Sequence, residues 1–190
     1  MKYFFCQMMT AWLLLQSQTV VAESSQPAEE KNGEILQKLP GYWNGEAIIT
    51  PVGPMDYDII FHTCSDSTVA GVAKTGASLH YWIFIRDLET LRLRFLSTFN
   101  GNRKPIYLVS SSSGDRIIKF LTPSLKFLTL DMEHTDQMVD LRVFHNNQLH
   151  VHIRLLKGMH PKAEPLPYHS RKNSCRGTPD EIASSLDSQS

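Results

Sequence analysis

The sequence lacks an excess of charge of either sign: 19 Lys and Arg residues balance 19 Asp and Glu residues. A chain of zero net charge has no overall field to attract nucleic acid, so we expect no nucleic-acid partner. The sequence also lacks a glycine-rich phosphate loop, a nucleophile elbow and an HExxH metal motif. No such motif therefore predicts catalytic residues, a cofactor or a metal site.

Long hydrophobic runs are also missing, except near the N-terminus. Lys2 is followed by a short, mostly apolar stretch over residues 3–15, and small or branched residues end at Ala22. This order is typical of a secretory signal peptide, and the apolar stretch is too short for an ordinary membrane-spanning helix. We predict a signal peptide over 1–22 and a secreted or periplasmic protein with no transmembrane segment after cleavage. The alternative is a buried N-terminal helix.

Cysteine is scarce, with 3 in the whole chain. Cys6 would leave with the signal peptide, so the mature protein would keep Cys64 and Cys175. In an oxidising compartment these two have only one possible intramolecular pairing. We predict a Cys64–Cys175 disulfide bond, with two free buried thiols as the alternative.

The remaining sequence is dominated by short stretches in which apolar and polar residues alternate. Leu91, Leu93 and Phe95 share one face of such a stretch, which predicts a strand with one buried side. Asn146-Asn147 and Asn100-Gly101 are typical of tight hairpin turns. Strands are expected near 44–50, 57–63, 69–74, 79–86, 90–97, 106–110, 116–121, 127–132, 139–144 and 149–155.

A short helix over 29–38, ended by Pro40, is the only helix expected before the strands. About ten strands without a long helix would leave an open sheet with an exposed apolar face and two bare edges. Closure removes both problems, so the fold class is all-β: an antiparallel up-and-down β-barrel of about 8–10 strands with a short N-terminal helix. A Greek-key sandwich is the alternative. The barrel domain is expected over 23–157 and a C-terminal wrapping tail, disordered at its end, over 158–190.

The motif Gly41-Tyr42-Trp43, placed between the short helix and the first strand, resembles the lipocalins and the wider calycin superfamily. The resemblance implies that Trp43 plugs the closed end of the barrel. It also implies that a basic residue of the last strand packs across that ring, with Arg154 as the first candidate and Lys157 as the alternative. A disulfide from the tail to the barrel is common in that superfamily. The Asp-Tyr pair of classical lipocalins is not matched, because Asp56 and Tyr57 lie too early in the chain.

A barrel of this size either fills with side chains or holds one small ligand. The predicted ligand-contacting residues are the larger inward-facing ones, namely Tyr57, Ile59, Phe61, Trp82, Leu93 and Phe95. Tyr57 and Tyr107 are the expected polar groups. Ile49 is expected to point inward from the first strand. The stretch 79–85 is apolar on both faces, so its outer face is expected either to be covered or to form an exposed patch for a partner.

His150 and His152 share one face of their strand, which suggests a metal site, but Arg154 lies on the same face and would repel a cation. We therefore expect ordinary solvated histidines and no metal. The predicted function is that of an exported lipocalin-like protein that binds a small apolar or amphipathic molecule inside the barrel. The alternatives are an envelope interaction module with a filled barrel and a partner protein in the envelope, or a barrel enzyme of the cyclase or isomerase type.

Overall fold

The computed structural model describes residues 34–88, 90–113, 116–123, 128–159 and 169–176. The predicted signal peptide and the predicted disordered end of the tail lie outside these residues. A short helix, α1, spans 34–38. The strands are β1 (Gly41–Ile49), β2 (Met55–Ser65), β3 (Thr68–Thr75), β4 (Ser78–Asp87), β5 (Thr90–Ser97), β6 (Ile106–Ser113), β7 (Ile117–Leu121), β8 (Leu128–His134), β9 (Met138–His145) and β10 (Gln148–Lys157), and they are followed by α2 (Arg171–Ser174).

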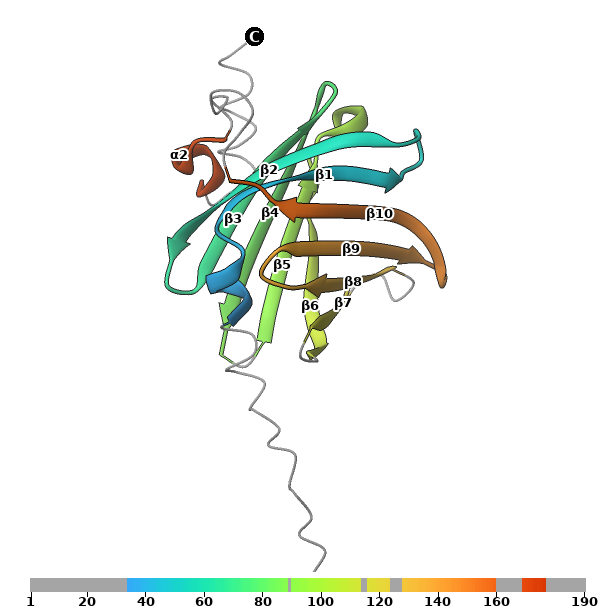
Figure 1. Ribbon diagram of the computed structural model, residues 1–190. Coiled ribbons are helices and arrows are strands. Elements are labelled where there is room, and N and C mark those ends of the chain that lie inside the picture. The colour runs from blue at the N-terminus through green and yellow to red at the C-terminus, as the bar shows by residue number, and fades with distance from the viewer. Residues whose placement is uncertain (1–33, 89, 114–115, 124–127, 160–168, 177–190) are drawn as a thin grey trace, which may run out of the picture.

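The ten strands form one closed barrel in which each strand pairs with its neighbours in the sequence (Figure 1). Every pairing is antiparallel, and β1 pairs with both β2 and β10 to close the sheet. Closure gives each strand hydrogen-bonding partners on both sides and encloses the apolar faces. The prediction of an antiparallel up-and-down barrel is confirmed.

The two Asn-containing turns behave differently. Asn146 and Asn147 join β9 to β10 with φ values of 51° and 63°, as expected of a tight hairpin. Asn100 and Gly101 also have positive φ, at 54° and 71°, but they lie within a longer connection over 98–105. The prediction of a tight hairpin at Asn100-Gly101 is therefore wrong.

Side-chain hydrogen bonds hold the conformation of this longer connection. The Asn102 side-chain amide donates to the carbonyl oxygens of Ser97 and Lys104, at 3.0 and 3.3 Å. The Lys104 backbone N–H in turn donates to Oδ1 of Asn102, at 3.1 Å. One asparagine side chain thus satisfies three backbone groups of the connection.

One end of the barrel is closed by α1 and the residues that follow it. The Trp43 indole N–H donates to the carbonyl oxygen of Leu39 at 2.6 Å. Lys157 Nζ donates to the carbonyl oxygen of Lys38 at 3.0 Å and lies 5.1 Å from the centre of the Trp43 ring. These two hydrogen bonds satisfy carbonyl groups that the end of α1 leaves without partners. The Lys157 ammonium is also attracted to the face of the Trp43 ring.

The closed end therefore has the arrangement that the lipocalin resemblance implies, but the basic residue on the Trp43 ring is Lys157 instead of Arg154. Gly41 has φ of 125°, a conformation open to glycine, and it turns the chain from α1 into β1. Trp43 is fully buried in the closed end. Lys157, and not Arg154, packs against its ring.

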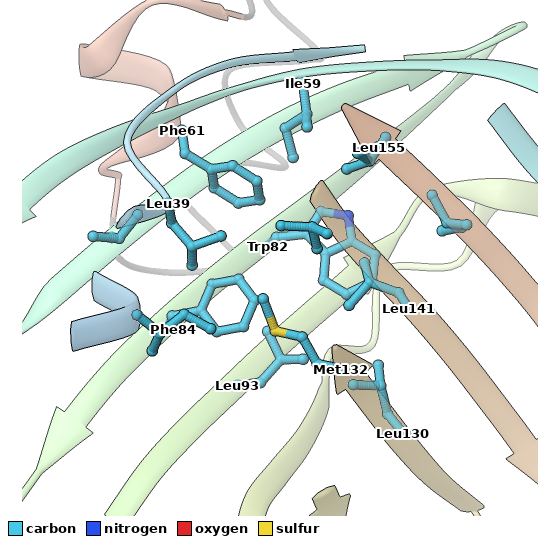
Figure 2. Packing of buried hydrophobic residues seen from close by; sticks show 14 of the residues in the cluster. Leu39, Ile59, Phe61, Trp82, Phe84, Leu93, Leu130, Met132, Leu141 and Leu155 are labelled. Carbon is cyan, nitrogen blue, oxygen red and sulfur yellow. The ribbon is translucent and has the colours of Figure 1, made fainter. Parts of the chain in front are cut away.

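The closed end of the barrel is filled by packed apolar side chains, of which Figure 2 labels Leu39, Ile59, Phe61, Phe84, Leu93, Met132, Leu141 and Leu155. Ile35 and Leu39 contribute from α1 and the residue after it, and both are almost completely buried. The rings of Phe61 and Phe84 meet edge to face at 6.0 Å between centres. This half of the barrel is a solid hydrophobic core.

Arg154 lies on the outer wall in a group of charged side chains around Asp140. Asp140 is 1% exposed, and it accepts hydrogen bonds from Arg154, Arg142 and His152 at 2.9, 2.7 and 2.9 Å. Burial alone would raise the pKa of Asp140, but hydrogen bonds from His152, Arg142 and Arg154 outweigh it and lower the pKa. Arg154 does not pack on Trp43, because its side chain lies on the outer face of β10, where it bonds Asp140.

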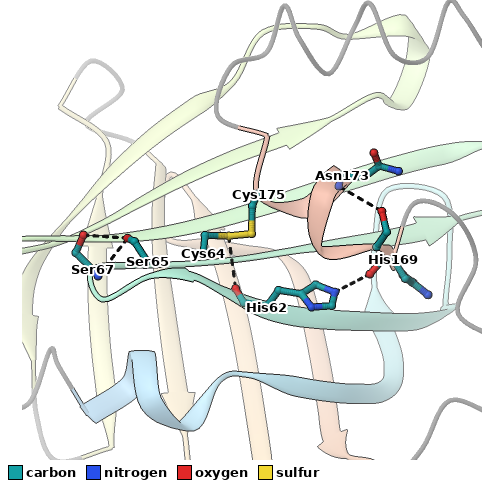
Figure 3. The surroundings of a disulfide bond; sticks show 8 residues. His62, Cys64, Ser65, Ser67, His169, Asn173 and Cys175 are labelled. Atoms are coloured by element: carbon teal, nitrogen blue, oxygen red, sulfur yellow. Dashed lines mark hydrogen bonds between the residues drawn. A yellow bond between two sulfur atoms is a disulfide. The ribbon is translucent and has the colours of Figure 1, made fainter.

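A disulfide joins Cys64 of β2 to Cys175 after α2, with 5.5 Å between the Cα atoms (Figure 3). The predicted pairing is confirmed. Next to it, the His62 ring Nε2 donates to the carbonyl oxygen of His169 at 2.6 Å. These two links attach the segment 169–176 to the wall of the barrel at β2.

The outer face of β4 is covered. Tyr81 is 5% exposed and Ile83 7%, and Tyr81 packs with Val72 and Leu96 in a small cluster outside the barrel. The alternative in which this face is an exposed apolar patch is therefore wrong. Within the described part of the chain, no helix has the length and apolar character needed to cross a membrane.

Candidate ligand-binding cavity

The half of the barrel opposite α1 encloses a cavity of about 730 Å³. Its mouth lies among the β1–β2, β3–β4 and β5–β6 connections, which contribute Val52, Gly76 and Phe99. Its walls come from inward-facing residues, namely Ala47, Met55, Tyr57, Thr75, His80, Trp82, Phe95, Ile106, Leu108, Leu128, Leu130, Val143, Val151 and Ile153. The volume lies within the range of sites that enclose small organic molecules.

Three of the six predicted ligand-contacting residues line this cavity: Tyr57, Trp82 and Phe95. The Trp82 and Phe95 rings lie 4.5 Å apart between centres. They form one continuous aromatic surface from two adjacent strands, because Trp82 and Phe95 are direct partners in the β4–β5 pairing.

The other three, Ile59, Phe61 and Leu93, do not line the cavity and belong to the solid core. Ile59 is paired with Trp43 across β1 and β2, which places it beside the closed end. Leu93 is 1% exposed and is paired with Phe84. These side chains do point inward, as expected, but they lie too deep to reach a ligand in the cavity.

Two further residues expected inside the barrel lie on its outer face. Ile49 was expected inside the barrel, but the β1–β10 register shifts between Ala47 and Ile49, and Ile49 is 40% exposed. A β-bulge of this kind turns the following side chain to the other face. Tyr107, expected as a polar group of the interior, is 57% exposed on β6.

Four side chains from three strands form a hydrogen-bonded series in the wall of the cavity, and Thr50, Ser78, Ser97 and Asn100 also line it. The Trp82 indole N–H donates to Tyr57 Oη at 2.7 Å. Tyr57 Oη lies 3.0 Å from His80 Nδ1, and His80 Nε2 lies 3.3 Å from Thr75 Oγ1. Sequence reasoning placed His80 on the same face as Trp82 but missed it, and missed Thr75, as site residues.

Burial determines the protonation states of His80 and Tyr57. Desolvation lowers the pKa of His80 to about 4 and raises that of Tyr57 well above its usual range, although the Trp82 hydrogen bond opposes the latter shift. Both groups are therefore neutral at pH 7. Their pKa values move away from neutrality, whereas a general acid–base pair works best with values near the working pH.

No charged side chain lines the cavity among the residues that the structure describes. An ionised group placed deep inside would lose its hydration and find no counter-ion, which is costly. The cavity therefore suits molecules, or parts of molecules, that carry no charge.

The histidines expected as a metal alternative lie outside the cavity. His152 is bonded to Asp140, and the His145 and His150 rings lie 6.2 Å apart between centres at the β9–β10 turn. Across the described ranges, no group of three or more His, Cys, Asp or Glu side chains is placed to hold a metal ion.

No family model matches this sequence, and no curated protein matches it with significance. A closed antiparallel barrel of ten strands is compatible with a lipocalin-like fold. Membership of the calycin superfamily stays a prediction that depends on Gly41, Trp43 and the basic residue on the Trp43 ring.

Proposed function

We propose that this protein is an exported carrier that binds a small apolar or amphipathic molecule inside the barrel. The observation that carries the proposal is the cavity of about 730 Å³, which is walled mainly by apolar side chains and open at one end. A barrel built only as a stable module has no need of such a space, because unfilled apolar volume costs stability.

The division of the barrel into two halves supports the same proposal. The closed half is filled and sealed by Trp43 and Lys157, so in the described part of the barrel a ligand would enter from the opposite end. Val52 and Phe99 border that end and are 60% and 44% exposed. Apolar side chains at an entrance reduce the cost of passing an apolar molecule through it.

Export is part of the proposal and has separate support. Residues 1–22 have the order of a signal peptide. The Cys64–Cys175 disulfide is of the kind that persists in an oxidising compartment such as the periplasm or the extracellular space. The test is cleavage after Ala22 in protein recovered from its own host, read by intact mass.

The carrier proposal is tested by native mass spectrometry of protein purified from its own host. We expect a reproducible extra mass that is released on denaturation. A Val143→Phe variant, which places a ring in the cavity, should carry less of it, whereas Thr129→Val on the opposite face of the sheet should carry as much. Protein without extra mass in several independent preparations would contradict the proposal.

A further inference from the structure

The direction of the hydrogen bonds between Trp82, Tyr57, His80 and Thr75 is determined by the Trp82 end. An indole N–H can only donate, so Tyr57 Oη accepts from Trp82. Tyr57 is fully buried, and its own proton has one acceptor in reach among the described residues, which is His80 Nδ1. If His80 Nδ1 carried the proton instead, the Tyr57 hydroxyl proton would be buried without an acceptor, at a cost of about 1–3 kcal/mol.

The order then continues to the wall of the cavity. A neutral imidazole that accepts at Nδ1 carries its proton on Nε2, and His80 Nε2 donates to Thr75 Oγ1. In this order Thr75 Oγ1 accepts from His80, so the hydroxyl proton of Thr75 is available to donate to another acceptor. Thr75 is 8% exposed and lines the cavity, and in the described structure its hydroxyl has no partner besides His80.

We infer that the ligand is an uncharged apolar molecule that carries a hydrogen-bond acceptor, such as a ketone, ester or ether oxygen, which receives the proton of Thr75. This inference rests on the proposed function and narrows its ligand class. The lack of charged groups in the described lining disfavours a buried anion or cation, and the donor order gives Thr75 a free proton that a ligand acceptor would satisfy.

Three probes of equal carbon number separate these chemistries: hexanophenone, hexylbenzene and 4-pentylbenzoate. The first two differ only in a carbonyl that replaces a methylene, and the third carries a negative charge. Each is measured by displacement of a neutral, polarity-sensitive dye, Nile red, from the full mature protein at pH 7. The ratio of hexanophenone to hexylbenzene affinity is corrected for the partition of these two neutral compounds between water and hexadecane, and the benzoate is compared with the ketone without this correction.

We expect hexanophenone to bind about two- to tenfold more tightly than hexylbenzene, the ratio that one neutral hydrogen bond provides. The benzoate should bind at least about tenfold more weakly than the ketone, because its charge would be buried without a partner. In Thr75→Val the preference for the ketone over the hydrocarbon should disappear. Thr75→Ser, which keeps the hydroxyl, and Thr129→Val, which removes one elsewhere, should both retain it.

The outcomes distinguish this inference from the proposed function. Failure of Nile red and of all three probes to bind would overturn the proposed function itself. Binding of hexylbenzene as tight as that of the ketone, equal binding of the benzoate, or an unchanged ketone preference in Thr75→Val would overturn the inference and leave the carrier proposal standing.

Discussion

Replacement of His80 by glutamine should change how the stability of the barrel depends on pH. In the wild type, the pKa of His80 is lowered from 6.5 to about 4 by burial. Between these values the unfolded chain binds a proton that the folded protein does not. The contribution of His80 to stability is therefore fully present above pH 6.5 and is lost as the pH falls toward 4.

The two pKa values give the size of the effect. Between pH 7 and pH 5 the wild type should lose about 2 kcal/mol through His80 alone. Glutamine can accept from Tyr57 and donate to Thr75 but does not titrate in this range. His80→Gln should therefore lose about 2 kcal/mol less than the wild type over the same interval.

The assay is urea unfolding followed by tryptophan fluorescence at pH 7, 6 and 5. The pKa values of His134 and His169 are also lowered by burial, but both residues are present in both proteins, so their contributions cancel in the difference. A difference below about 0.5 kcal/mol would refute the reasoning, because it would mean that His80 is hydrated and titrates normally. An NMR titration of the His80 ring with a midpoint near 4 would support it independently.

Three further substitutions test other parts of the structure. Tyr57→Phe should cost about 1–3 kcal/mol in urea unfolding, since the Trp82 N–H loses its acceptor, while Tyr107→Phe on the exposed face should change stability by less than about 0.5 kcal/mol. The double variant Cys64→Ser and Cys175→Ser opens a link across 111 residues and should cost up to about 4–5 kcal/mol by the same assay, so a loss below about 1 kcal/mol would contradict a stabilising disulfide. Lys157→Met should cost about 1–2 kcal/mol and alter the near-ultraviolet circular dichroism of Trp43, and an equal spectral change in Arg154→Met would contradict the assignment of Lys157.

The sequence was sufficient to predict the barrel because its strands alternate with a period of two and its turns carry Asn and Gly. Alternation in 90–97 and 139–144 placed Leu91 and Leu141 inside, where both are buried. Lys157 follows the same rule: it has the parity of the inward residues Ile153 and Leu155, whereas Arg154 has that of His152. The motif alone favoured Arg154, whereas the strand periodicity favours Lys157 as the basic residue that faces Trp43.

The candidate site was only partly predictable, for two physical reasons. Alternation tells which side chains point inward but not how deep they lie, so Phe61 and Phe95 looked equivalent although one fills the core and the other lines the cavity. The contact between Tyr57 and His80 joins β2 to β4 across β3, and their separation of 23 residues carries no local signal. A bulge of the kind that exposes Ile49 is likewise decided by pairing and not by local sequence.

The central claim is that one half of the barrel is filled and the other half is hollow, and two substitutions on the same face of β9 test it most directly. Val139 is 1% exposed in the core, and Val143 lines the cavity. In ligand-free protein, Val139→Phe should cost about 1–3 kcal/mol of unfolding free energy through overpacking. Val143→Phe should change it by less than about 0.5 kcal/mol, because the ring enters free space. Equal losses in the two variants would contradict the account, since they would show that no empty volume exists beside Val143.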